Sequence, residues 1–150
     1  MRPLFAAAFA LAALSAGAVP NPVARDFDPL QLNGRWNGVD LELRSACRTP
    51  ENNGSRGTYA QFDVVVDPQG NLSIGQSGIT GLNCSYSGRY GAERGRLSWE
   101  GGYTCTDGKR GDFRSTAIET SATALTIRLG IQLTSSEACA IDGILSMARF

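Results

Sequence analysis

From Gly34 onward, apolar and polar residues alternate in short runs that are separated by Gly, Asp and Asn. The clearest run covers residues 125–133, where Leu or Ile occupies every second position. Strict alternation of this kind is typical of a strand with one buried face, and no stretch after Gly34 keeps a helical spacing. The pattern therefore predicts an all-β domain.

The alternating runs amount to about eight strands at a spacing of roughly 8–12 residues, which is typical of a sandwich or a barrel. In the first run, the apolar face carries Val39, Leu41 and Leu43, and the polar residues between them face the other way. Because the connections are short, neighbouring strands should pair antiparallel, and closure removes the unpaired edges. We therefore expect an antiparallel meander that closes into an eight-stranded up-and-down barrel, with a two-sheet sandwich as the alternative.

The N-terminal residues differ in composition from the rest of the chain. Arg2 precedes an apolar run, and a small-residue cleavage site ends at Ala18, so we expect residues 1–18 to be a signal peptide. The apolar run is too short to span a bilayer comfortably, so we expect no transmembrane segment. Residues 19–33 are rich in Pro and predict an extended N-terminal arm, which leaves residues 34–150 as the barrel domain. The product is expected to be periplasmic or secreted.

The four cysteines contain no CxxC pair, which argues against zinc-ribbon and thioredoxin sites. In an exported chain an even number of cysteines predicts disulfides, although spacing alone leaves the pairing open. The strand pattern favours one pairing, since Cys84 starts one strand and Cys105 ends the next, while Cys47 follows the first strand and Cys139 starts the last. We therefore expect Cys84–Cys105 and Cys47–Cys139 bridges, both pointing inward.

Composition narrows the chemistry that the chain can perform. The 150 residues carry 14 Lys+Arg, 14 Asp+Glu and no His, so His-based nucleophilic pairs and His-ligated metals are excluded. The balanced charge argues against a nucleic-acid partner. The remaining acid–base candidates are carboxylates, and those closest in sequence predict no convergent pair: Glu100, Asp107, Asp112 and Glu119. We therefore expect no catalytic residues, no cofactor and no metal, which favours a non-enzymatic role.

Four aromatic residues share one face of the central hairpin, namely Tyr86, Tyr90, Trp99 and Tyr103. They are candidate ligand-binding residues, because hydroxyl and indole groups on an apolar wall suit an amphipathic pocket. The alternative is a packed barrel core, since eight strands leave little interior space.

Two short patterns resemble known proteins. Gly34-Arg35-Trp36 opens the first strand and Arg149 lies on the last, a combination that resembles the calycin barrels, which include lipocalins, avidins and small bacterial protease-inhibitor barrels. The resemblance implies that Arg149 lies across the indole of Trp36 and closes one barrel end by a cation–π contact. The spacing Cys84-x-Tyr86-x-Gly88, continued around Cys105, resembles small secreted bacterial proteins of uncharacterised function and implies a disulfide hairpin.

The longest polar connection covers residues 48–57, and long loops on a rigid scaffold often carry recognition. We expect an exported binding module that acts through its loops on a protein, such as an enzyme to be inhibited, or on a cell-envelope component. The alternative is a lipocalin-like carrier of a small apolar ligand. A cavity of a few hundred Å³ open at one end would favour the carrier, and two carboxylates converging in a cleft would favour an enzyme.

Overall fold

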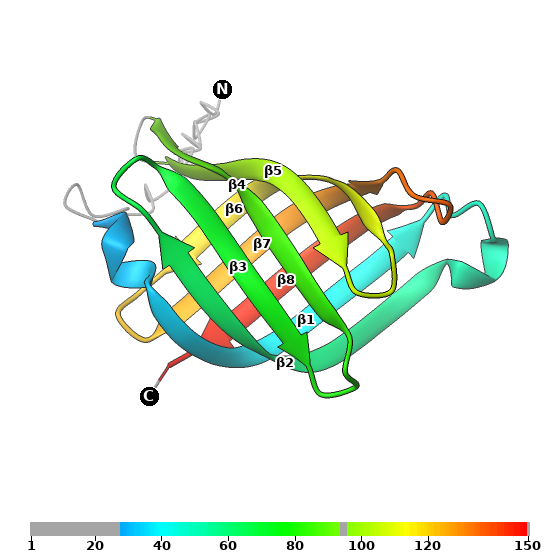
Figure 1. Ribbon diagram of the computed structural model, residues 1–150, viewed down its shortest axis with the longest axis horizontal. Helices are drawn as coiled ribbons and strands as arrows, with labels where there is room; N and C mark the ends of the chain where they lie inside the picture. The colour runs from blue at the N-terminus through cyan, green and yellow to red at the C-terminus, as the bar shows by residue number, and fades with distance from the viewer. Residues whose placement is uncertain (1–27, 94–95, 150) are drawn as a thin grey trace, which may run out of the picture.

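The computed structural model describes residues 28–93 and 96–149, and the predicted signal peptide lies outside the described residues. The described chain forms a barrel of eight strands with two short 3-10 helices, η1 (Pro29–Leu32) and η2 (Pro50–Asn52) (Figure 1). The strands are β1 (Gly34–Ser45), β2 (Gly54–Val66), β3 (Asn71–Gly78), β4 (Asn83–Glu93), β5 (Arg96–Cys105), β6 (Arg110–Thr120), β7 (Ala124–Leu133) and β8 (Ala140–Ala148). Within the described ranges, no helix is long and apolar enough to cross a membrane.

Every strand pairs antiparallel with its neighbour in sequence, and β1 also pairs with β8. The register of this closing pair runs from Asn37 opposite Ala148 to Ser45 opposite Ala140. Each strand in the described residues therefore has a neighbour on both sides, and the barrel has no edge strand. The prediction of a closed eight-stranded up-and-down barrel is confirmed, and the sandwich is excluded.

Aromatic and aliphatic side chains form one buried cluster inside the barrel. Trp99 packs against Phe113 at 4.4 Å between ring centroids, and Tyr86 packs against Tyr103 at 4.9 Å. Gly88 and Gly101 face each other across β4 and β5, and a Cβ on either would overlap the backbone of the opposite strand. Glycine at both positions therefore lets the two strands come close together beside the aromatic cluster.

The facing that we predicted for β1 is wrong. Leu41 and Leu43 are 48% and 51% exposed on the outer surface, whereas Asp40 and Arg44 are buried inside the barrel. Trp36, which is fully buried opposite Phe62, determines which face of β1 points inward. Because side chains alternate with a period of two, the residues at even positions after Trp36 also point inward, whatever their polarity.

Three further segments differ from the sequence-based predictions. The polar loop predicted over residues 48–57 is shorter, because η2 occupies part of it and β2 already begins at Gly54. The described part of the predicted extended arm forms η1, and Leu32 is buried against the core. In β6 a register shift between Ser115 and Ala117 interrupts the strict alternation expected within each strand.

Both predicted disulfides are present, Cys47–Cys139 and Cys84–Cys105. Cys84 and Cys105 are direct partners across β4 and β5. Cys47 lies beyond the end of β1, after Ala46, whose φ of 49° ends the regular strand. Both bridges lie at the barrel end opposite η1, where β1 ends and β8 begins. Two disulfides suggest an oxidising, exported environment.

Candidate ligand site at the barrel mouth

The barrel end beside η1 is closed by the side chains of Arg149 and Trp36. The guanidinium carbon of Arg149 lies 4.5 Å from the ring centroid of Trp36, and its Nε and Nη1 donate hydrogen bonds to the carbonyls of Ala122 and Asn33. The indole Nε1 of Trp36 donates to the carbonyl of Leu32 at 3.0 Å. The structure therefore brings together the two residues that the calycin resemblance implied, at the closed end of the barrel.

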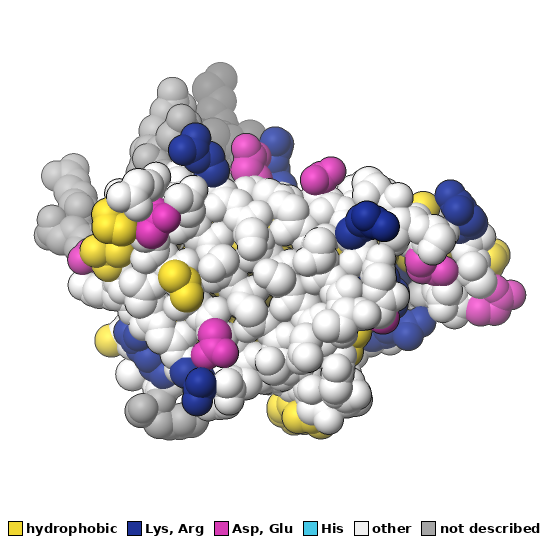
Figure 2. Space-filling model, in the orientation of Figure 1, with side chains coloured by type: hydrophobic (Ala, Val, Ile, Leu, Met, Phe, Trp, Pro, Cys, Tyr) yellow, Lys and Arg dark blue, Asp and Glu magenta, His cyan; other side chains and the backbone are white. Residues whose placement is uncertain are grey.

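The opposite end holds a cavity of about 500 Å³ that opens to the surface, which we call the mouth cavity. Its inner wall carries side chains from four strands and its rim comes from β2, from the β3–β4 connection and from the turn between β5 and β6. Charged side chains of both signs gather at the barrel end that carries η2 (Figure 2). The residues that line the mouth cavity include Asp40, Glu42, Arg44, Arg56, Thr58, Gln76, Leu82, Cys84, Tyr103, Asp107 and Lys109.

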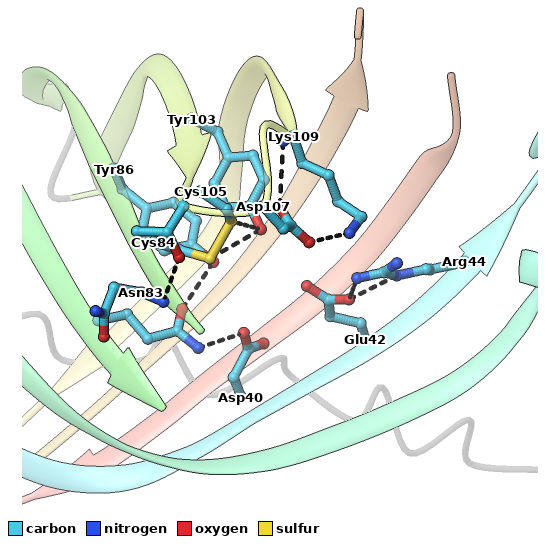
Figure 3. Close-up of a disulfide and its surroundings, with 12 residues drawn as sticks. Asp40, Glu42, Arg44, Asn83, Cys84, Tyr86, Tyr103, Cys105, Asp107 and Lys109 are labelled. Atoms are coloured by element: carbon cyan, nitrogen blue, oxygen red, sulfur yellow. Dashed lines mark hydrogen bonds and ion pairs between the residues drawn. A yellow bond between two sulfur atoms is a disulfide. The ribbon is translucent and has the colours of Figure 1, made fainter. Parts of the chain in front are cut away.

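A chain of hydrogen bonds crosses the inner part of the mouth cavity. The Tyr86 hydroxyl donates to Gln76 Oε1 at 3.3 Å, and Gln76 Nε2 donates to Asp40 Oδ2 at 2.9 Å. The Tyr103 hydroxyl donates to the disulfide, since its oxygen lies 2.7 Å from the sulfur of Cys105 and bonded sulfurs carry no proton. Figure 3 shows the carboxyl of Asp40 directed from β1 toward the side of the barrel that carries Tyr103 and the disulfide.

Two ion pairs lie nearer the opening. Arg44 binds Glu42 through Nε and Nη2, at 2.8 and 2.6 Å, and both side chains are less than a tenth exposed. Lys109 binds Asp107 in the turn that faces them (Figure 3). In each pair the two side chains are two residues apart in the sequence, so the carboxylates of Glu42 and Asp107 are neutralised by neighbouring cations on their own segments.

Asp40 differs from these groups because it is buried and pairs with no cation among the described residues. It is 5% exposed, and burial, reinforced by the nearby charge of Glu42, raises the pKa of its carboxyl to about 7. Hydrogen bonding to Gln76 and the charge of Arg44 act in the opposite direction and are weaker. A raised carboxyl pKa in a cleft is a recognised mark of a functional site.

The predicted aromatic candidates lie mostly beneath the cavity. Tyr86, Trp99 and Tyr103 are buried in one cluster, whereas Tyr90 is half-buried, and of these four only Tyr103 contributes to the lining of the mouth cavity. Trp99 donates its indole N–H to the carbonyl of Leu72 at 3.2 Å. Burial raises the pKa of the Tyr86 and Tyr103 hydroxyls, which keeps both protonated as donors.

Sequence reasoning missed the residues that dominate the cavity, namely Asp40, Glu42, Arg44 and Gln76. Their signal was present in the spacing from Trp36, since Asp40, Glu42 and Arg44 share its even parity on one strand. Apolar residues at the odd positions of β1 hid this signal, because they predicted the opposite facing.

The carboxylates considered from sequence do not form a catalytic pair. Glu100 is exposed and bound to Arg114, Asp112 and Glu119 are not buried, and Asp107 lies in a turn. Asp40 and Glu42 do converge in one cavity, but they project from the same wall, two residues apart on β1. Among the described residues, the one cluster with the composition of a metal site contains Cys47 and Cys139, whose thiols are already joined in a disulfide.

Comparisons with known proteins find the fold and no family. No family model matches the chain, and no curated protein matches it. Solved structures similar to it include EF1p2_mFAP2b bound to DFHBI, with a TM-score of 0.50, 13% identity and coverage of 80% of this chain and 94% of that one. A redesigned β-barrel has a TM-score of 0.48 at 13% identity, over 80% of this chain and 92% of the other.

A de novo designed fluorescence-activating β-barrel has a TM-score of 0.47 at 13% identity, over 83% of this chain and 99% of that one. At this identity a likeness shows the fold alone. The closed eight-stranded antiparallel barrel fits the calycin-like fold that the Gly-x-Trp pattern implied, and no family is identified by these comparisons.

Proposed function

We propose that this protein is an exported, non-enzymatic binding barrel that takes up a small polar molecule through the mouth cavity. The observation that carries the proposal is a cavity of about 500 Å³ at one end, whose inner wall includes the buried carboxyl of Asp40, which pairs with no cation in residues 28–93 and 96–149. Burying such a group costs folding free energy, and an apolar side chain would pack there at lower cost. A bound polar molecule would offset that cost.

The cavity separates the two roles that the sequence left open. A pocket of a few hundred Å³ reached from one end supports a carrier over a module that acts only through its loops. The lining changes the expected ligand, because Asp40, Glu42 and Gln76 would leave a purely apolar molecule facing polar groups without partners. The ligand is therefore polar, with an apolar part small enough to lie against Leu82 and the Cys84–Cys105 disulfide.

The test is to fill the cavity without disturbing the barrel. Thr58 lies opposite Asp40 in the register and contributes to the cavity lining, so Thr58→Trp should obstruct the opening. Thr126→Trp is the matched control, because Thr126 lies between the buried residues Leu125 and Ile127 and points outward. Native mass spectrometry against a mixture of amines, carboxylates, sugars and alcohols should find at least one ligand for the wild type and the control, and none for Thr58→Trp. A wild type that binds nothing, or a Thr58→Trp variant that binds equally well, would overturn the proposal.

A hydrolase acting through carboxylates is the second candidate, favoured by the presence of Asp40 and Glu42 in one cavity. An acid with a pKa of about 7 is suited to proton donation, but glycosidases place their two carboxyls on opposite sides of the scissile bond. Asp40 and Glu42 lie on one strand, and Asp107, which faces them from the turn between β5 and β6, is bound by Lys109; this arrangement favours binding. Turnover of para-nitrophenyl glycosides by the wild type, and its loss in Asp40→Asn, would replace the binding proposal with this one.

A further inference from the structure

We propose that the mouth cavity selects an organic cation, and that Asp40 receives its positively charged head. The inference rests on the proposed function and gives the chemical class of its ligand.

The direction of the hydrogen-bond chain presents Asp40 as an acceptor. The Tyr86 hydroxyl donates to Gln76 Oε1, which turns Gln76 Nε2 toward Asp40 Oδ2. The second oxygen, Oδ1, accepts no hydrogen bond from residues 28–93 and 96–149. Because a protonated amine carries up to three donors and a full positive charge, it satisfies this free oxygen better than a neutral donor does.

The charge pattern leaves Asp40 as the one uncompensated carboxyl among the described residues that line the cavity. Glu42 is bound by Arg44 and Asp107 by Lys109, so these carboxylates already have their cations. Arg56, which lies opposite Glu42 on β2 at the rim, is exposed and hydrogen-bonded to Asn52. An anion would therefore meet a cation at the rim but the uncompensated carboxyl of Asp40 farther inside, whereas a cation finds its partner at the inner wall.

The size and lining of the cavity favour an organic cation over a metal ion. A hard cation such as Ca²⁺ needs a cage of six or more oxygens at short range. Here one carboxyl oxygen is free, and the other carboxylates on the walls are held in ion pairs. Leu82, the Tyr103 ring and the Cys84–Cys105 disulfide give the remaining wall an apolar part against which the body of an organic molecule packs.

A bound cation would also control the protonation of Asp40. Burial holds the pKa of this carboxyl at about 7, so it is half protonated at neutral pH, and a positive head would displace the proton. Affinity should therefore fall about tenfold for each pH unit below 7 and level off above 8. The groups that face Asp40 and enter this balance are Glu42 and Arg44 on β1, Arg56 on β2, Tyr86 on β4, Tyr103 on β5, and the Asp107–Lys109 pair in the turn.

The experiment uses three ligands of similar shape and different charge: phenethylamine, phenethyl alcohol and phenylacetate. Titration calorimetry of the wild type from pH 5 to pH 8 should show binding of the amine, at least about tenfold weaker binding of the alcohol, and none of the acid. Asp40→Asn should lose at least about tenfold in amine affinity at pH 8 and should lose the pH dependence. The matched control, Asp142→Asn, removes an exposed carboxylate on the outer face of β8 and should change neither.

Several results would overturn the inference. These are a wild type that does not bind the amine, equal affinity for the amine and the alcohol, and an Asp40→Asn variant with unchanged amine affinity. Each leaves the proposed function standing, provided that the Thr58→Trp comparison still identifies a ligand of another class. A wild type that binds nothing in that comparison removes both.

Discussion

Replacing Asp40 with Asn should stabilise the barrel, and the gain should depend on pH. The carboxyl has a pKa of 3.8 in the unfolded chain and about 7 in the folded protein. Between these values the folded state holds a proton that the unfolded state has released, so the contribution of Asp40 is most favourable below pH 3.8 and declines as the pH rises to 7. Each unit of pKa corresponds to 1.36 kcal/mol, so the full cost above pH 7 is about 4 kcal/mol.

Asparagine keeps a similar shape and an oxygen that accepts the hydrogen bond from Gln76, but it does not ionise. We therefore expect Asp40→Asn to be more stable than the wild type by about 4 kcal/mol at pH 8 and by about 2 kcal/mol at pH 5. Titratable groups elsewhere affect both proteins alike, so their contributions cancel in the difference.

The measurement is urea unfolding of both proteins at unit steps from pH 5 to pH 8, followed by Trp fluorescence with both disulfides intact. Asp142→Asn serves as the control for removing a carboxylate from the surface and should change stability by less than about 0.5 kcal/mol. A difference between wild type and Asp40→Asn that stays constant across the pH range would refute the reasoning, because it would show that Asp40 does not titrate in that interval.

Five further variants test the fold. Replacing Cys47 and Cys139 by Ser should lower the free energy of unfolding by about 4.6 kcal/mol, and replacing Cys84 and Cys105 by Ser should lower it by about 3.3 kcal/mol. The first loss is larger because the bridges join residues with sequence separations of 92 and 21, and the longer closed segment restricts the unfolded chain more. Urea unfolding measures both losses, and the reverse order would contradict this chain-entropy account. Arg149→Ala removes the cation–π contact and two hydrogen bonds, and it should lower the free energy of unfolding by about 1–3 kcal/mol. A variant as stable as the wild type would show that the contacts of Arg149 do not stabilise this end of the barrel. Leu41→Ser should change the free energy of unfolding by less than about 0.5 kcal/mol, because this side chain faces outward, whereas Phe62→Ala should lower it by about 3–5 kcal/mol. A large loss of stability in Leu41→Ser would instead support the facing predicted from the sequence, with Leu41 inside the barrel.

The features that local pattern determines were predicted well from the sequence. Alternation and turn residues indicated the antiparallel meander, the removal of its unpaired edges indicated the closure of β1 on β8, and the positions of the cysteines along the closed meander indicated both disulfides. The prediction succeeded because each of these features depends on the order of the strands, and short connections leave few orders to choose from.

The inner face of β1 was mispredicted because two signals on the strand conflict. The odd positions carry three apolar residues, Val39, Leu41 and Leu43, whereas Trp36 occupies an even position. The number of apolar residues therefore predicts that the odd positions point inward. The register opposes this choice, since it places Trp36 opposite Phe62 and Asp40 opposite Leu145, and these partners are fully buried. Pairing across strands is a tertiary property, so the pattern within one strand did not reveal it.

The cost of this arrangement is itself an argument for function. On the half of β1 nearest the mouth, an uncompensated carboxyl is buried while two leucines are exposed, which is the opposite of what stability favours. Strand β7, by contrast, follows the ordinary rule, with apolar residues inside and polar or small ones outside. Departures from consistent patterning tend to coincide with functional sites, and this one lies where a cavity of about 500 Å³ opens to solvent. The position of Asp40 is therefore better explained by the proposed polar ligand of the cavity than by what the fold requires.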